Sequence, residues 1–178
     1  MPVIIACLQT NFYLEEALTV LLMALTNPNV GEISEETISM PLASLLPAVA
    51  SHQPDAQLRH YAYRILSLLL QRSSSLTRMS ILRELLSDES LPIRMRAATI
   101  ALVKEALLEG LAAGDNVFAS PRFLQAFGPV LFRIPDGFGL INDEKMEGEA
   151  VRIAEVLALY YICLIRDTKN KVRSVTLR

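Results

Sequence analysis

Apolar residues recur at intervals of three, four and seven along almost the whole chain, the spacing that places them on one face of an α-helix. Strand-like alternation bounded by turn pairs is missing, so the pattern predicts an all-α fold. Pro41 and Pro47 leave residues 38–50 as either one kinked helix or two short ones. The other expected helices cover residues 11–26, a segment beginning at Ser34, and residues 56–71, 76–86, 90–114, 120–127 and 143–167.

Several of these helices carry recognisable end signals. Ser90 is a typical N-cap residue, with Pro92 in the first turn, where the missing N–H is harmless, and Gly114 at the far end. A shorter helix is expected to start at residues 120–121 and to end at Gly128 and Pro129. The last helix is expected to be amphipathic, with an apolar face made of Val151, Ala154, Leu157, Tyr161 and Leu164.

An internal repeat connects two of the helices. The pattern Leu58-Arg59-x-x-Ala62-x-x-Ile65 recurs as Ile93-Arg94-x-x-Ala97-x-x-Ile100, and 94 − 59 gives a period of 35 residues. A fixed period in this range predicts stacked helical units that bury their apolar faces against one another. The small residues Ala62, Ala97 and Ala98 are expected to pack where two helices approach closely.

The second copy of the repeat begins at a turn that contains Asp88, six positions before Arg94. This arrangement resembles the turn and inner helix of a HEAT repeat, and we expect Arg94 to be tied to Asp88 as a structural pair. The sequence therefore predicts an irregular HEAT/armadillo-like α-solenoid of antiparallel helix pairs. Residues 1–178 are expected to form a single helical-repeat domain, either complete or a fragment of a longer solenoid, with a basic, frayed tail at 168–178.

The formal net charge of −2 conceals bands of alternating sign. Residues 1–58 carry six acidic residues and no Lys or Arg, and residues 105–155 carry nine acidic and four basic residues, so both segments are negative. Residues 59–104 carry eight basic and three acidic residues, and residues 156–178 carry five basic residues and one acidic residue, so both of these segments are positive. Such bands are either ordinary solvated helix faces or stripes that line a groove for a charged partner. Nucleic acid is not an expected partner, because the Lys and Arg residues are not interleaved with aromatic residues.

Cysteine usage and hydropathy indicate the compartment. Cys7 and Cys163 are too few for a disulfide framework or a zinc site, which fits a reducing environment. The apolar start of the chain has no basic region before it, as a signal peptide would have. The most hydrophobic stretch, residues 17–25, is far shorter than the roughly 20 residues of a membrane span. We therefore expect a cytoplasmic or nuclear protein, or one found in both, without membrane insertion.

The residues that usually carry catalysis are not arranged for it. His52 and His60 have no partner at a metal or triad spacing, and Gly137-Phe138-Gly139 lacks the strand and helix start of a phosphate loop. The acids between residues 143 and 149 do not have the spacing of an EF-hand, and they suit a helix N-terminus. No catalytic residue, metal ligand or cofactor site is predicted, and the protein is not expected to be an enzyme.

Five phenylalanines, at positions 118, 123, 127, 132 and 138, form the most prominent aromatic cluster. They are either a core that closes the last repeat or anchors of a protein interface beside Arg122 and Arg133, since binding hot spots favour arginine with aromatic residues. Phe138, between two glycines, is the best candidate for exposure. The candidate partner-binding residues are Arg59, Arg96, Arg122, Arg133 and Phe138.

The segment Val117-Phe-Ala-Ser-Pro-x-Phe-Leu-x-x-Phe-Gly-Pro-Val-Leu-Phe-Arg133, followed by Ala154-Glu-x-Leu-Ala-Leu-Tyr-Tyr161, resembles the C-terminal part of the glomulin family. That family also includes the fungal Yap-binding proteins and a plant lateral-root factor. The resemblance covers roughly residues 52–170 and implies a helical scaffold without enzymatic activity. It carries no partner-contacting residue over to this chain.

The partners that the resemblance implies are proteins. Animal members dock on the RING subunit of cullin-RING ubiquitin ligases, whereas fungal members bind a stress-response transcription factor or act at kinetochores. The expected function is therefore that of a non-catalytic adaptor that regulates such a partner. The alternative is a structural capping or oligomerisation segment of a larger helical-repeat protein, with no partner of its own.

Overall fold

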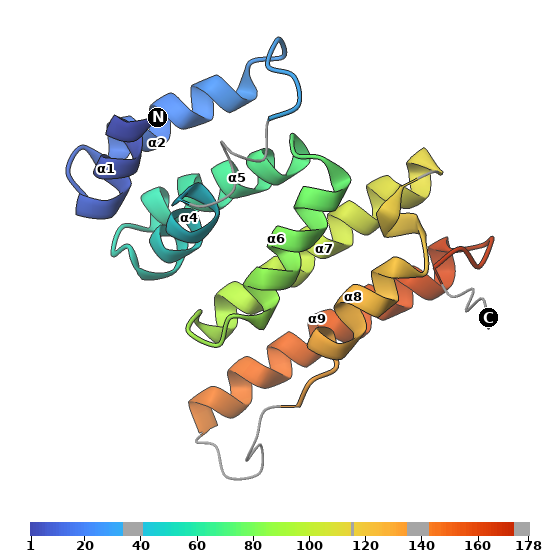
Figure 1. Cartoon of the computed structure of the whole chain (residues 1–178). Helices are drawn as coiled ribbons and strands as arrows, with labels where there is room; N and C mark the ends of the chain where they lie inside the picture. The colour runs from blue at the N-terminus through green and yellow to red at the C-terminus, as the bar shows by residue number, and fades with distance from the viewer. Residues whose placement is uncertain (34–40, 115, 135–142, 173–178) are drawn as a thin grey trace. The chain divides into compact units, whose positions relative to one another are not determined.

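The computed structural model describes residues 1–33, 41–114, 116–134 and 143–172. Within these ranges the chain forms helices and no strand, which confirms the all-α prediction (Figure 1). The elements are α1 (Pro2–Thr10), α2 (Leu14–Thr26), α4 (Pro41–His52), α5 (Ala56–Gln71), α6 (Ser75–Ser87), α7 (Ile93–Ala113), the 3-10 turn η1 (Val117–Ala119), α8 (Arg122–Leu131) and α9 (Asp143–Arg166).

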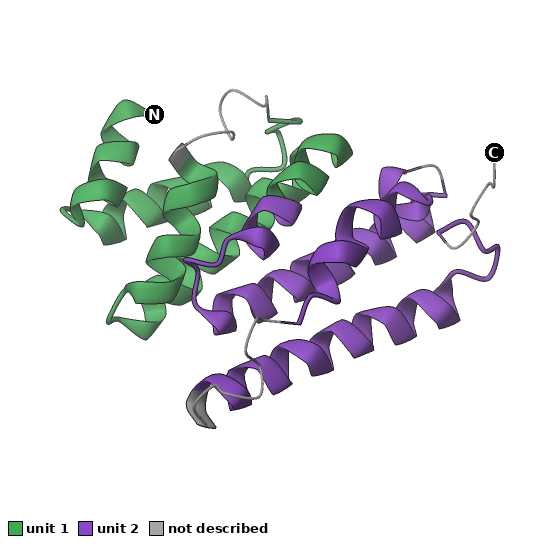
Figure 2. Cartoon of the chain, turned by 60° about the horizontal axis from the view of Figure 1, so that its bottom comes forward, with its two compact units in different colours: residues 1–81 green, residues 82–178 purple. Residues whose placement is uncertain are grey.

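The helices gather into two compact units, Met1–Ile81 and Leu82–Arg178 (Figure 2). In the first unit, α4 and α5 form a hairpin across a three-residue turn, where the Asp55 side chain accepts hydrogen bonds from the backbone N–H groups of Gln57 and Leu58 and so caps α5. The core of this unit is aliphatic. Its most completely buried side chains include Leu18, Leu42, Leu46, Ile65, Leu66, Leu69 and Leu70.

Helices α2 and α5 run in the same direction. Arg72, which follows α5, donates hydrogen bonds to the carbonyl oxygens of Asn27 and Val30, and its own carbonyl accepts from the backbone N–H of Ile33 at 2.9 Å. These bonds tie the chain after α2 to the end of α5, so the C-terminal ends of the two helices lie together.

The second unit repeats this arrangement with α7 and α9. Three contacts follow one another along the pair: Arg96 to Glu149 at 3.5 Å, Lys104 to Glu155 at 3.9 Å, and the Lys171 ammonium to the carbonyl of Gly114. Residue numbers rise together on both sides, so α7 and α9 are parallel, as Figure 1 shows. In each unit, therefore, two long parallel helices are separated in sequence by a shorter helix, α4 or α8.

The aromatic cluster divides between core and surface. Phe118, Phe123 and Phe127 are buried, with ring centroids 5.2 to 6.4 Å apart, and they pack η1 against α8. A Cβ added at Gly110 of α7 would lie 2.9 Å from the Cβ of Phe118, so this glycine allows η1 to approach α7 closely. Phe132, in contrast, is 51% exposed. The core interpretation therefore holds for Phe118, Phe123 and Phe127, and a role of Phe132 as an interface anchor stays a prediction.

The 35-residue repeat lies on α5 and α7. Ala62 and Ile65 are fully buried in the first copy, and Ala97 and Ile100 are buried in the second, while Ala98 is half-buried. These are the environments expected of packing residues. The pairing of Asp88 with Arg94 is not found.

The Asp88 carboxylate instead accepts hydrogen bonds from the backbone N–H and hydroxyl of Ser90, at 2.8 and 2.6 Å. These two bonds hold its pKa below the ordinary value, with a smaller contribution from the charge of Arg96, which lies two residues after the exposed Arg94 and is half-buried. Arg94 is exposed and lines a different hollow, with Lys145, Glu147 and Val151 of α9, so the predicted pair is not formed among the described residues. Ser90 is likewise not the cap of α7, which begins only after Pro92.

Other helix boundaries also differ from the sequence prediction. Residues 2–10 form α1, which was not expected, and left-handed backbone at Asn11 and Tyr13, with φ of 59° and 53°, separates it from α2. Residues 41–52 form one helix that contains Pro47. Helix α8 likewise continues through Pro129 to Leu131, because the buried Phe127 and Leu131 hold its apolar face on the core.

Candidate functional site

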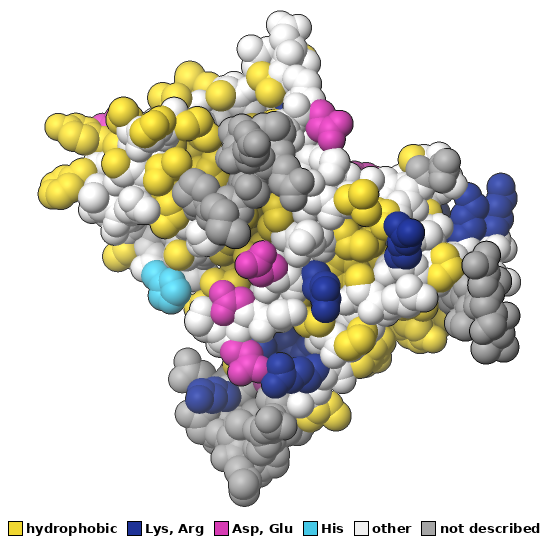
Figure 3. All heavy atoms as spheres, viewed as in Figure 1, with side chains coloured by type: hydrophobic (Ala, Val, Ile, Leu, Met, Phe, Trp, Pro, Cys, Tyr) yellow, Lys and Arg dark blue, Asp and Glu magenta, His cyan; other side chains and the backbone are white. Residues whose placement is uncertain are grey.

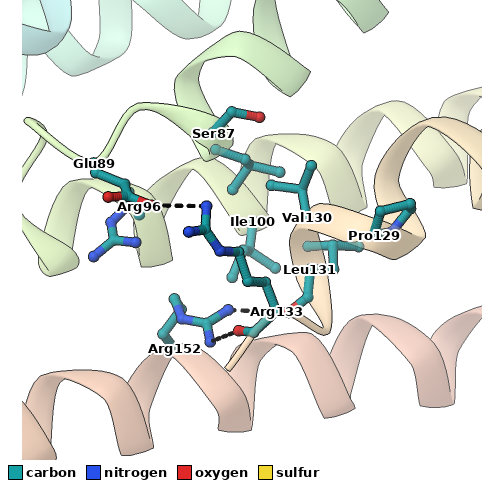
Figure 4. Close-up of a pocket in the computed structure, with 10 residues that line it drawn as sticks. Ser87, Glu89, Arg96, Ile100, Pro129, Val130, Leu131, Arg133 and Arg152 are labelled. Atoms are coloured by element: carbon teal, nitrogen blue, oxygen red, sulfur yellow. Dashed lines mark hydrogen bonds and ion pairs between the residues drawn. The ribbon is translucent and has the colours of Figure 1, made fainter. Parts of the chain in front are cut away.

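Three arginines from different parts of the second unit line one hollow of about 440 Å³ (Figure 4). Arg96 comes from α7, Arg152 from α9, and Arg133 from the segment that follows α8. The remaining lining is largely apolar and includes Leu86, Ile100, Pro129, Val130 and Leu131, together with Ser87 and Glu89. A hollow of this kind combines a few charged groups with an apolar wall, as ligand-binding pockets of proteins commonly do.

Arg152 and Glu149 form the buried floor of this site. The Arg152 Nε donates to Glu149 Oε2 at 2.6 Å, and its terminal nitrogens donate to the carbonyl oxygens of Leu131 and Arg133 at 3.0 and 2.9 Å. The side chains of Arg152 and Glu149 are only 7% and 2% exposed. Arg152 is therefore fully occupied in joining α9 to the end of α8, and its role is structural.

Arg96 is the least satisfied of the three guanidinium groups. Among the described residues, its one ion pair is the 3.5 Å contact of a terminal nitrogen with Glu149 Oε1, and Glu149 already has the shorter contact with Arg152. The Arg96 Nε is buried and has no hydrogen-bond acceptor among the described residues. Since a buried donor without an acceptor costs free energy, an incoming anionic oxygen would be stabilised here.

Arg133 lies at the open side of the hollow. Its guanidinium is 2.7 Å from Glu89 Oε1, but the two side chains are 57% and 66% exposed, so this pair is screened by solvent and contributes little to stability. The neighbouring Phe132 and Ile134 are 51% and 66% exposed. The ring of Phe132 meets that of Tyr160 on α9 edge to face, with centroids 6.0 Å apart.

The sequence predicted Arg96 and Arg133 as partner-binding residues, and the structure brings these two together. Arg122 is exposed at the start of α8 and does not line the hollow. Arg59 lies in the first unit, where it donates to the carbonyl oxygens of Gln53 and Pro54, both at 2.7 Å, and so stabilises the turn before α5. Phe138 lies outside the described residues.

Sequence reasoning missed Arg152 and Glu149. The sequence feature that could have identified them is their separation by three residues, which places both on the same face of a helix as Val156, Leu159 and Cys163. That face is the buried one, whereas the apolar face predicted for the last helix is exposed. The exposed fractions are 53% for Val151, 57% for Leu157, 64% for Tyr161 and 40% for Leu164. This prediction was wrong because the helix has two apolar faces, and only packing selects between them.

A family model described as the uncharacterised protein family YAP/Alf4/glomulin matches residues 6–177. The chain belongs to the YAP/Alf4/glomulin family. This confirms the resemblance found in the C-terminal segment, and the match includes both compact units, the arginine-lined hollow and α9. No curated protein and no solved structure matches the chain.

Membership of the YAP/Alf4/glomulin family indicates a non-catalytic binding role. Within the described ranges, no three His, Cys, Asp or Glu side chains are grouped so that they could hold a metal ion. No helix in the same ranges is long and apolar enough to cross a membrane. The arginine-lined hollow is the candidate binding site, because Arg96 and Arg133 can both hydrogen-bond an anionic group there.

Proposed function

We propose that this member of the YAP/Alf4/glomulin family is a non-catalytic helical scaffold that regulates a protein partner by binding it. The observation that carries the proposal is the convergence of Arg96 and Arg133 on one hollow, beside the exposed side chains of Phe132 and Ile134. Arginine with aromatic and aliphatic groups is the composition that concentrates binding energy at protein interfaces.

The part of the partner that enters the hollow is an acidic side chain next to an apolar residue. A carboxylate would supply the acceptor that the Arg96 Nε lacks, and it would compete with the exposed Glu89 for Arg133. The apolar neighbour would cover Pro129 and Val130 on the wall. Because such a contact desolvates the arginines, it would be stronger than the surface pair that it replaces.

A HEAT-like stack is the scaffold that we propose. The parallel pairs α2 with α5 and α7 with α9, each with a short helix between them in sequence, are what consecutive repeats of a helical solenoid would contain. The 35-residue period connects α5 of the first unit to α7 of the second. Such scaffolds present binding surfaces made of successive helices.

The partner classes follow from the family. We propose either the RING subunit of a cullin-RING ubiquitin ligase or a stress-response transcription factor, in the cytoplasm or the nucleus. The second candidate function, an oligomerisation or capping segment, is favoured by a different observation, the exposed apolar face of α9.

The experiment is a binding titration of the purified chain against both partner classes from the same organism, after crosslinking capture in native cells. Arg133→Glu and Phe132→Ala should each weaken binding at least tenfold, since hot-spot truncations exceed about 1.4 kcal/mol. Arg83→Glu, an exposed arginine of α6 outside the hollow, is the matched control and should bind like the wild type.

Equal binding by all of these variants would show that the hollow is not the binding site. If native capture retains no protein and neither partner class binds, the adaptor function itself is wrong. Circular dichroism of each variant separates lost binding from lost folding.

A further inference from the structure

Helix α9 is apolar on its exposed face as well as on its buried face between residues 150 and 165. Between residues 150 and 165 it has two charged side chains, Arg152, which is buried, and Glu155, which pairs with Lys104 of α7. At 3.6 residues per turn, the half of the helix opposite the buried face has no charge over these sixteen positions. A helix that is apolar all round is normally covered on both sides.

The exposed face runs along the outside of the second unit. Figure 2 shows α7 and α8 on one side of α9 and, among the described residues, no helix of that unit on the other. Its exposed apolar side chains include Val151, Leu157, Tyr161, Leu164 and Ile165, and Figure 3 shows hydrophobic side chains at the surface of this part of the molecule. The face is therefore open to a partner of matching shape.

Side-chain size changes along this face. The first half presents Ala150, Val151 and Ala154, with Ala158 just beyond the midpoint. The second half presents the larger residues Tyr161, Leu164 and Ile165, and Leu157 lies just before the midpoint. All eight are exposed, so the face has a shallow end and a prominent end.

We propose that the occupant of this face is α9 of a second copy of the chain, packed antiparallel about a two-fold axis between residues 157 and 158. Each residue then faces the residue of the other copy for which the two residue numbers add up to 315. This register places a smaller side chain opposite a larger one in every pair. The pairs are Ala150 with Ile165, Val151 with Leu164, Ala154 with Tyr161, and Leu157 with Ala158. A two-fold axis makes each of these contacts twice.

The charges beyond the apolar face agree with the same register. Glu147 is exposed just before the face, and Arg166 and Lys169 are exposed just after it. Antiparallel pairing places Glu147 of one copy opposite residue 168 of the other copy, which lies between Arg166 and Lys169. A parallel pair would instead place Tyr161 on Tyr161 and like charges together, and it would align the helix dipoles unfavourably.

The alanines permit close contact, because the distance between two helix axes depends on the side chains between them. Sixteen residues at 1.5 Å per residue make a face about 24 Å long, which buries on the order of 400–500 Å² on each copy. This is at the low end for a specific interface, so the dimer should dissociate in the micromolar range or above.

Sedimentation velocity of the full chain over a range of concentrations tests the association. The wild type should form a concentration-dependent dimer, and Tyr161→Glu should weaken it at least tenfold, because the change occurs twice in the interface. Met23→Glu, a 70% exposed apolar position on α2, is the matched control and should dimerise like the wild type.

The register has its own test. Glu147→Lys should weaken the dimer several-fold, and the further change Arg166→Glu should restore it. In an oxidised mixture, the Ala154→Cys and Tyr161→Cys chains should crosslink to each other, whereas Ala154→Cys alone should not, since its two copies lie about 10 Å apart along the helix. The wild-type chain controls for its own Cys7 and Cys163.

A chain that stays monomeric up to about 1 mM, or a dimer that persists in Tyr161→Glu, would overturn the proposal and leave the face to another protein. Crosslinking of Ala154→Cys with itself would overturn the antiparallel register. The dimer does not depend on the arginine-lined hollow, so Arg133→Glu should leave it intact, and failure of one proposal does not imply failure of the other.

Discussion

Replacement of Arg152 by methionine tests the structural reasoning most directly. The change keeps an unbranched side chain but removes the bonds to Glu149 and to the carbonyl oxygens of Leu131 and Arg133. Glu149 is 2% exposed, so its charge would remain buried with only the 3.5 Å contact to Arg96. Breaking a buried ion pair from one side costs about 3–5 kcal/mol.

This loss is large for a protein of this size. Natural domains are stable by about 5–15 kcal/mol, and each kcal/mol lowers the melting temperature by about 2–4 °C at 150–250 residues. Arg152→Met should therefore melt roughly 6–20 °C below the wild type. Arg152→Lys should be intermediate, because an ammonium keeps the charge but cannot reach three acceptors in the fork geometry of a guanidinium.

The assay is urea and thermal unfolding followed by far-ultraviolet circular dichroism. Because the two compact units can unfold in separate transitions, hydrogen exchange should be measured in parallel, and the lost protection should be confined to α9 and to residues 131–134. Arg122→Met, at an exposed position, is the control and should change the free energy of unfolding by less than about 0.5 kcal/mol.

The double variant Arg152→Met/Glu149→Met isolates the pair. Replacing a buried ion pair with apolar residues is often neutral, so the double variant should be more stable than the sum of the two single losses by at least about 2 kcal/mol. A loss below about 1 kcal/mol in Arg152→Met, or strict additivity of the two changes, would refute the reasoning. Either result would mean that the pair is hydrated in solution.

Three further predictions concern single positions. Gly110→Ala should cost about 1–3 kcal/mol in thermal unfolding through overpacking against Phe118, whereas Gly128→Ala, with nothing within 4 Å of the added Cβ, should not destabilise. Asp55→Ala should cost about 1 kcal/mol by removing the cap of α5, and a loss confined to the first unit in hydrogen exchange would identify it. Asp88→Asn should be less stable than the wild type at neutral pH. Because the folded-state pKa of Asp88 is lowered, the difference should begin to shrink below the ordinary carboxyl pKa of 3.8 and be lost as the pH falls through the folded-state pKa. A difference that stays constant into strong acid would contradict this.

Local sequence signals located many of the helices closely. Helix α5 spans the predicted residues 56–71, and α7 ends at the predicted Gly114, which has a left-handed φ of 82°. At these helix ends the turn residues and the periodicity of the apolar residues indicate the same boundary, so few other boundaries are compatible with the sequence. At α8 they conflict: Gly128 and Pro129 indicate an end, but burial of Leu131 outweighs the lost backbone hydrogen bond and the helix continues.

The candidate site was only partly predictable. Arg96 and Arg133 could be proposed from their residue type and surroundings, but their meeting in one hollow depends on contacts between helices far apart in the chain. The role of Arg152 could not be seen at all, since its acceptors are backbone carbonyls at residues 131 and 133, about twenty positions away. Hydrogen bonds of that kind leave no pattern in the sequence.

The sequence by itself determined the all-α class, the 35-residue repeat between α5 and α7, and membership of the YAP/Alf4/glomulin family, because periodicity and turn residues are local properties. Only the tertiary structure decided which face of α9 is buried. Both faces satisfy the helical period, and α7 and the end of α8 select the one that carries Glu149 and Arg152, whose charges they neutralise. The more apolar face is thereby left exposed, since no described helix of the second unit covers it.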